Sequence, residues 1–191
     1  MLGPALQLDR HALIWINSHH SLLLDAIFAP VAYAGEAGAI WFAVCLGLLV
    51  FGKREHKVTG LVLLASIILV DRLITAPLGA AFFRTRPYIA LEGVRQVGVR
   101  WSGTSFPSGH AHSVWIAAII LGNQWRKLLV PLILFGLLTC YSRPYFGMHY
   151  PLDVIAGSAI GVPAGLFILS GRRAWTRYRT SKSPAGMQPT R

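Results

Sequence analysis

Three polar clusters interrupt an otherwise apolar sequence, and each contains side chains suited to binding an anion or to moving a proton. They read RTRP at 84–87, FPSGHAHS at 106–113 and SRPYFGMHYPLD at 142–153. The planar guanidinium of arginine binds two phosphoryl oxygens at once, and histidine exchanges protons near neutral pH. The clusters are therefore candidates for a site that acts on a phosphate group.

The third cluster contains a histidine and an aspartate with the spacing of a nucleophile and its partner. Pro151 suits the first turn of a helix. If that helix begins near His149, then His149 and Asp153, four residues apart, lie on one face. The carboxylate can then accept a hydrogen bond from one imidazole nitrogen, which leaves the other nitrogen basic and free to attack.

The middle cluster has the composition of a helix N-terminus that faces an anion. Ser108, an N-cap residue type, stands between Pro107 and Gly109, and an apolar run follows. The free N–H groups at such a helix start bind phosphate. His110 lies in the first turn, where it can hold a proton near a bound anion, whereas His112 faces about 160° away.

Arginines complete this interpretation, and metal ligands do not enter it. Arg86 and Arg143 are suited to clamp a group whose charge spreads over its oxygens in the transition state. A metal site built from His110, His112 and His149 lacks the HExxH pattern or a comparable ligand spacing. We therefore expect no metal and no other cofactor.

The rest of the chain must position these clusters within a membrane. Of its 191 residues, 54% are hydrophobic and 13% are charged, and the mean hydropathy is +0.52, too apolar for an ordinary soluble domain. Apolar stretches near or somewhat below the ~20 residues of a membrane-crossing helix occur at 22–34, 37–52, 58–83, 111–122, 128–141 and 152–170. We predict an all-α fold, a bundle of six transmembrane helices with an amphipathic interfacial helix at the N-terminus.

The basic residues indicate how the bundle faces. The formal net charge is +11, and twelve of the 18 Lys and Arg residues fall on one side of a six-span topology: Arg10, those of 53–57, Arg126 with Lys127, and those of 172–191. The positive-inside rule makes that side cytoplasmic and places the three polar clusters on the outer face. The segment 5–16, apolar along one helical face, is expected to lie on the inner surface. Anionic lipid headgroups explain the basic tail better than nucleic acid does.

One domain accounts for the whole chain. We expect a membrane-embedded domain over 1–191, with an interfacial helix at 1–18, a six-span core at 20–171 and a basic, flexible cytoplasmic tail at 172–191. Cys45 and Cys140 lie inside apolar runs without disulfide or metal spacing, so we expect thiols that fill the core.

Two complete motifs carry a family resemblance. PSGH at 107–110, followed by Ser142-Arg143, five residues, His149, three residues and Asp153, resembles the second and third signature motifs of the type 2 phosphatidic acid phosphatase superfamily. The six-span layout is similar to the membrane lipid phosphatases of that superfamily. Its soluble branches, acid phosphatases and vanadium haloperoxidases, share the motifs but lack six apolar spans.

The resemblance implies a role for each matching position. His149 forms a phosphohistidine, Asp153 orients and polarises it, and His110 protonates the departing lipid oxygen. The phosphoryl oxygens are held by Arg86, Arg143, Ser108 and the Gly109 backbone. Metal is not required.

The first motif of the superfamily is incomplete. It reads lysine, six residues, then Arg-Pro; Arg86-Pro87 is present, but Gly79 occupies the lysine position. Arg84, or Arg72 on roughly the same helical face as Gly79, can supply the missing cation. Arg72 with Asp71 also fits a structural polar contact in the middle of a span.

The expected function is removal of a terminal phosphate from a lipid phosphate or pyrophosphate at the outer leaflet of a bacterial plasma membrane. Undecaprenyl pyrophosphate is the preferred substrate, with phosphatidylglycerol phosphate, phosphatidic acid and a lipid A phosphate as competitors. The partners are the lipid substrate and the bilayer, without nucleic acid. A phosphotransferase that uses the same phosphohistidine and a non-catalytic lipid-phosphate transporter remain the alternatives.

Overall fold

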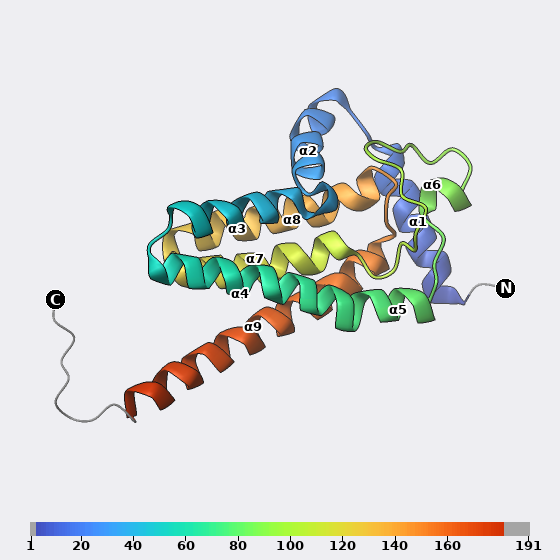
Figure 1. Ribbon diagram of the computed structural model, residues 1–191. Coiled ribbons are helices and arrows are strands. Elements are labelled where there is room, and N and C mark those ends of the chain that lie inside the picture. The colour runs from blue at the N-terminus through green and yellow to red at the C-terminus, as the bar shows by residue number, and fades with distance from the viewer. Residues whose placement is uncertain (1–2, 182–191) are drawn as a thin grey trace.

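The computed structural model describes residues 3–181, in which every regular element is a helix (Figure 1). The elements are α1 (Pro4–Ser18), α2 (Leu22–Ala34), η1 (Glu36–Gly38), α3 (Ala39–Phe51), α4 (Arg54–Val70), η2 (Asp71–Thr75), α5 (Ala76–Ala81), α6 (Pro87–Ala90), α7 (Gly109–Gln124), η3 (Arg126–Leu128), α8 (Leu129–Tyr145) and α9 (Pro151–Ser181). The all-α prediction is confirmed for these residues.

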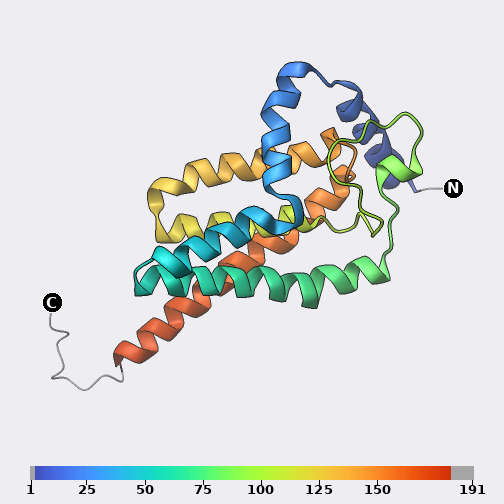
Figure 2. The same cartoon turned by 45° about the horizontal axis from the view of Figure 1, so that its top comes forward.

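Helix α7 forms the centre of the bundle. It packs against α4, α8 and α9, and its buried residues include Val114, Ile116, Ala117 and Ile120. These side chains join Cys45 of α3 in one hydrophobic core. Figures 1 and 2 show α3, α4, α7 and α8 running side by side, while the C-terminal part of α9 extends beyond them.

Two glycines of α9 allow it to approach α7 closely. A Cβ atom on Gly157 would lie 2.4 Å from the Ser108 carbonyl oxygen, and one on Gly161 would lie 2.5 Å from that of His112. Small residues four apart let helix backbones meet within a membrane. This contact brings the start of α9, with Asp153, next to the start of α7, with His110.

The prediction of six separate spans is not confirmed. By length and hydropathy, three described helices can cross a membrane: Arg54–Ala81, Arg126–Tyr145 and Pro151–Trp175. The helices Leu22–Ala34 and Ala39–Phe51, which cover the stretches expected at 22–34 and 37–52, are bent by 56° to each other; counted together as one span, they raise the number to four at most. Each of α2 and α3 has only 13 residues and α7 has only 16, fewer than the ~20 that a membrane-crossing helix needs.

Helix α1 lies at the other end of the bundle from the one that the six-span topology predicted. The N-terminal helix packs on α8 and α9 at the end of the bundle that holds 84–108 and 146–150, opposite the α3–α4 connection (Figure 1). The side chain of Asn17 donates to the Tyr145 carbonyl at 2.8 Å, and the Leu152 amide donates to Asp9 at 2.8 Å. The expectation that 5–16 and Arg10 lie on the same side as 53–57 is therefore wrong. The amphipathic pattern predicted that this segment is a helix, but it could not predict the end of the bundle at which the helix packs.

Helix α9 also changes the description of the C-terminus. It continues through Ser181, so residues 172–181, expected in a flexible tail, are helical. Residues 182–191 of that predicted tail lie outside the described part of the chain.

Candidate active site

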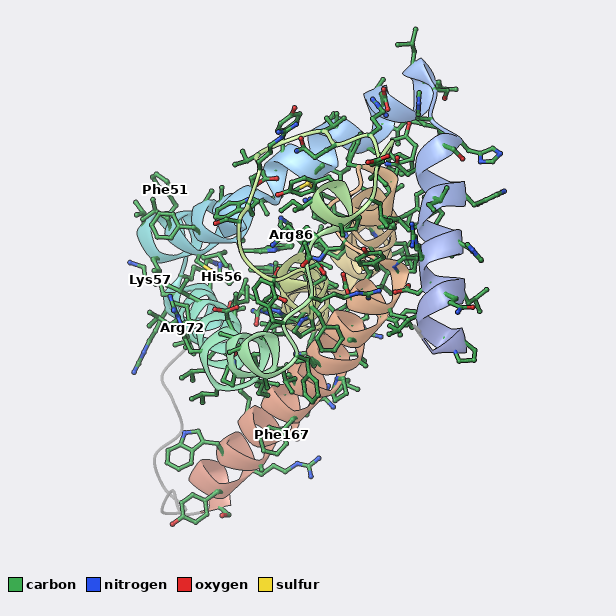
Figure 3. The ribbon with its side chains drawn as sticks, turned by 90° about the vertical axis from the view of Figure 1, so that its right-hand side faces the viewer. Phe51, His56, Lys57, Arg72, Arg86 and Phe167 are labelled. Carbon is green, nitrogen blue, oxygen red and sulfur yellow. The ribbon has the colours of Figure 1, made fainter. Side chains whose placement is uncertain are left out.

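Residues from all three polar clusters meet at one end of the bundle. His149 lies between α8 and α9 and His110 in the first turn of α7, with ring centroids 6.3 Å apart and the rings nearly perpendicular. Together with Arg86 and Arg143 they line a cavity of about 630 Å³. Figure 3 looks onto this end, with Arg86 among the helix ends and Arg72 toward the edge of the bundle.

The hydrogen bonds of His149 fix which nitrogen is free to attack. Its Nδ1 lies 2.7 Å from the carbonyl oxygen of Ser105. Because a carbonyl only accepts, Nδ1 carries the proton and Nε2 keeps its lone pair. Burial, followed by the charges of Arg86 and Arg143, lowers the pKa of His149 well below its ordinary value. The imidazole is therefore neutral at pH 7 and can act as a nucleophile.

The predicted hydrogen bond between Asp153 and His149 is wrong. Asp153 Oδ2 is 3.9 Å from His149 Nδ1, a contact too long for a hydrogen bond. Helix α9 begins at Pro151, so His149 precedes it and does not stack above Asp153. The Ser105 carbonyl orients the ring instead. Sequence reasoning missed Ser105 because it acts through its backbone, which leaves no signature in the side chain.

Asp153 is held by other groups, among them Arg84. Its Oδ2 accepts from the Tyr150 amide at 2.8 Å, and its Oδ1 accepts from Arg84 Nη1 at 2.7 Å. Arg84 Nη2 donates to Asp9 at 2.6 Å, and its guanidinium lies 3.6 Å from the centre of the Tyr150 ring. Burial opposes the charge of Arg84, but the two carboxylates prevail and raise its pKa. Arg84 therefore does not replace the missing lysine, because both ends of its fork bind carboxylates.

Arg86 lies directly beside the unprotonated nitrogen of His149. Its Nη1 donates to the Met148 carbonyl at 3.2 Å and to His149 Nε2 at 3.3 Å, while its Nε donates to the Gly103 carbonyl at 3.2 Å. A phosphoryl group approaching Nε2 would thus meet a guanidinium at once.

Several buried polar atoms around the cavity lack a hydrogen-bond partner among the described residues. They are Nε and Nη1 of Arg143, Oγ of Ser108 and Nε2 of His110. Arg143 is 1% exposed, and its Nη2 lies 3.7 Å from Glu36. Unpaired buried donors are costly, so such a cluster calls for an explanation. An anion with several oxygens would satisfy them together.

The start of α7 adds backbone groups to this cluster. Ser108 is the N-cap residue, as the sequence predicts, but its hydroxyl makes no capping bond to the helix. Gly109 follows as the first helical residue, and no atom lies closer than 3.9 Å to the position of a Cβ there. The free N–H groups of the first turn are oriented toward the helix start, where they can bind an anion. His112, expected to face away, contacts Thr75 through Nδ1 at 3.2 Å.

The position of the missing lysine has no room for a side chain. A Cβ on Gly79 would lie 2.8 Å from Thr104 Cγ2 and 2.9 Å from the Phe106 carbonyl oxygen. Arg72, on the π-helical turn η2, lines the same cavity as His149, and its side chain is 76% exposed. It lies 3.8 Å from Asp71, the polar contact that the sequence allowed. Of the two candidates, Arg72 is therefore the one whose exposed side chain can reach a phosphate in this cavity.

Residues 3–181 contain no group of three or more His, Cys, Asp or Glu side chains arranged to hold a metal ion. A second, more apolar cavity of about 810 Å³ lies between α1, α5 and α6. Its lining includes Arg84 and Tyr150 but neither histidine of the pair, so the chemistry belongs to the cavity around His149.

Comparisons with known proteins identify a matching family and similar phosphatases. The family model described as PAP2 superfamily matches residues 59–177. The chain is 33% identical over 158 residues to undecaprenyl-diphosphatase BcrC of Bacillus subtilis, covering 78% of this chain and 75% of that protein. It is 29% identical over 201 residues to lipid A 4'-phosphatase of Bacteroides thetaiotaomicron, covering 96% and 87%.

Two solved structures have a similar fold. The crystal structure of Aquifex aeolicus LpxE has a TM-score of 0.71 and 33% identity, covering 86% of this chain and 94% of that one. The first transmembrane PAP2-type phosphatidylglycerolphosphate phosphatase of Bacillus subtilis has a TM-score of 0.72 at 19% identity, covering 91% and 88%, which supports the fold.

Proposed function

The chain belongs to the PAP2 superfamily, and from this premise we propose that it is the membrane phosphatase of undecaprenyl pyrophosphate, working through a phosphohistidine. The broader class is established: it is a membrane lipid phosphatase of this superfamily. The unpaired buried donors of Arg143, Ser108 and His110, beside the neutral His149, are the observation that supports the mechanism.

The reaction has two steps. Burial, followed by the charges of Arg143 and Arg86, lowers the pKa of His110 without substrate, so His110 takes up its proton when the negatively charged phosphate binds beside it. The lone pair of His149 Nε2 attacks the terminal phosphorus, and the bond from phosphorus to the leaving oxygen breaks while protonated His110 gives that oxygen a proton. Water then attacks the phosphohistidine, His110 takes a proton from it, and the bond from phosphorus to Nε2 breaks. Free phosphate leaves and the enzyme returns to its starting state.

The remaining site residues stabilise the charge on the phosphoryl oxygens. Arg86 reaches the oxygens next to Nε2, and Arg143 and Ser108 supply the buried donors that are unpaired without substrate. The amides of the α7 N-terminus, beginning at Gly109, add further donors. Preorganised donors of this kind usually contribute the largest share of catalysis.

Arg72 gives a reason to favour a diphosphate. It lines the cavity on the side of α4 and α5, away from the cations that surround His149. We assign it to the second phosphate, in place of the lysine that Gly79 excludes. The relative from Bacillus subtilis carries the name of an undecaprenyl-diphosphatase, which agrees with this assignment. Lipid A phosphate is the second candidate, because a relative named lipid A 4'-phosphatase is 29% identical to this chain and covers 96% of it.

The charge distribution supports an outward-facing site. The basic residues of 53–57, with Arg126 and Lys127, lie at the end of the bundle opposite His149 (Figure 1). The positive-inside rule assigns that end to the cytoplasm. We infer a bacterial plasma membrane with the site on its outer face and the C-terminus inside.

Phosphate release tests the proposal. The detergent-purified protein, in EDTA, is given undecaprenyl pyrophosphate, phosphatidylglycerol phosphate, phosphatidic acid and lipid A in parallel, without an acceptor alcohol. We expect metal-independent release, fastest from undecaprenyl pyrophosphate and abolished in His149→Ala. The control His20→Ala changes an exposed histidine at the same end of the bundle and should retain activity.

Each other result has a clear meaning. Faster release from another lipid would reassign the substrate. Release only after an acceptor alcohol is added would identify a phosphotransferase. Binding without turnover would favour a transporter.

A further inference from the structure

The N-terminal helix places a buried carboxylate against the machinery of the site. Asp9 of α1 is 4% exposed. Its Oδ2 accepts from Arg84 Nη2 at 2.6 Å, and its Oδ1 accepts from the Leu152 amide at 2.8 Å. Arg84 Nη1 in turn donates to Asp153 at 2.7 Å. One guanidinium therefore bridges two buried carboxylates, one from each end of the sequence.

A buried carboxylate on an amphipathic helix requires a specific reason. Large apolar side chains of α1 are exposed, among them Leu8 at 70% and Trp15 at 61%, beside exposed polar residues such as Arg10, which is the composition of a membrane-surface element. A helix that only binds the membrane surface needs no charged residue on the face that packs against the protein, because burying an unpaired charge there is costly. Asp9 is paired, and its partner is the residue that holds Asp153.

The bridge reaches the nucleophile through short contacts. Asp153 Oδ2 accepts from the amide of Tyr150, the residue that follows His149. The carbonyl of Asp153 accepts from the Ser108 amide at 2.9 Å. Rotation of the Asp153 carboxylate would therefore break its hydrogen bond to the amide that follows His149, while a shift of the Asp153 backbone would be passed to the start of α7.

We propose that Asp9 is a positioning residue for the phosphatase reaction: through Arg84 it fixes Asp153, and through Asp153 the backbone of His149. This assignment rests on the proposed function. Helix α1 is then a structural part of the active site as well as a membrane-surface element. Asp9 does not line the cavity around His149, so it acts only through its neighbours.

Three variants test the bridge in the full-length protein. Asp9→Asn keeps the size and the acceptor for Leu152 but removes the charged partner of Arg84. Because a small displacement of a reacting group is costly, kcat should fall about tenfold or more. KM should change by less than about twofold, since Asp9 does not touch the substrate. Arg84→Gln should lower kcat further than Asp9→Asn does, because it leaves two buried carboxylates without their charged partner. The double variant Asp9→Asn/Arg84→Gln should recover part of that loss.

A matched control separates positioning from general stability. The Asp25 carboxylate accepts from Arg95 at 3.0 and 2.5 Å and links α2 to the same loop, without contacting Asp153. Asp25→Asn should lower the melting temperature as Asp9→Asn does and leave kcat within about twofold. Equal kcat values in the two variants, or a loss confined to KM, would overturn the proposal.

Thermal unfolding of the same variants gives a second readout that does not need turnover. If the bridge exists, Asp9→Asn/Arg84→Gln melts above Arg84→Gln, because the neutral pair removes an unpaired buried carboxylate. Additive losses would overturn the bridge. Absence of turnover in the wild-type protein would overturn the proposed function instead, and the melting data would still decide whether the bridge forms.

Discussion

Replacing Arg143 with methionine should separate stability from activity. The arginine side chain is 1% exposed, and Nε and Nη1 have no partner among the described residues. Its charge is compensated by Glu36 at 3.7 Å, a contact too long for a hydrogen bond. Arg143→Met fills the same space with an apolar chain and removes a desolvated cation. Removing one partner of a buried pair is usually destabilising because the other charge is left uncompensated. Here Glu36 keeps its hydrogen bond from Trp101 Nε1 at 3.1 Å, so we expect Arg143→Met to change the melting temperature little.

The activity, by contrast, should fall. The two unpaired donors are available to phosphoryl oxygens, and a hydrogen bond to a charged group contributes about 1.5–3 kcal/mol. Losing both hydrogen bonds should reduce the stabilisation of the transition state by about 3–6 kcal/mol. At about 1.4 kcal/mol for each factor of ten, kcat/KM should fall by about 10² to 10⁴.

The assay follows phosphate release and thermal unfolding in the same preparation, with Arg126→Met as the control. Arg126 is exposed at the opposite end of the bundle, so its replacement should leave kcat/KM unchanged. Retention of kcat/KM within about threefold by Arg143→Met would show that its free donors do not bind the phosphoryl group. A melting temperature well below that of the wild type would show that Arg143 is a structural residue.

Three further predictions concern the leaving group, the pH profile and the first motif. His110→Ala should lose less activity on p-nitrophenyl phosphate than on a lipid substrate in kcat assays, because a weakly basic leaving oxygen needs little protonation; equal losses would argue against the acid role. Neutral His149 is the active form and its pKa is lowered, so kcat/KM should fall with decreasing pH only well below 6.5. Arg86→Gln removes a positive charge and should move this acid limb to higher pH; an unmoved limb would contradict the assignment. Gly79→Lys should lower the melting temperature rather than improve activity, because its Cβ meets Thr104 at 2.8 Å; a more active, equally stable variant would show that the lysine position is open.

The sequence predicted which residues gather at the site better than it predicted their hydrogen bonds. Motif spacing placed His110 and His149 at helix ends, and the structure brings the two rings face to edge. It could not show that the Ser105 carbonyl orients His149, because every residue type has that group. Nor could it show that Arg84 binds Asp9, because the two lie 75 residues apart.

The membrane layout was predicted less well for a related reason. Hydropathy identifies apolar segments, but it does not distinguish two spans from one that bends at a short turn. Gly38, with φ of +73°, lies at the bend between α2 and α3. If α2 and α3 count as one span, α1 falls on the same side of the membrane as the site. The partners of the buried Asp9 and Asn17 agree with this position.

The covalent intermediate is the most direct test of the account. Protein incubated with substrate labelled on its terminal phosphate is quenched and examined for acid-labile, alkali-stable radioactivity on histidine. His110→Ala with a good leaving group should accumulate the label, because hydrolysis of the phosphohistidine needs the base. We predict label in that variant and in His20→Ala and its absence from His149→Ala. Label that persists in His149→Ala, or turnover without any labelled protein, would contradict nucleophilic attack by His149.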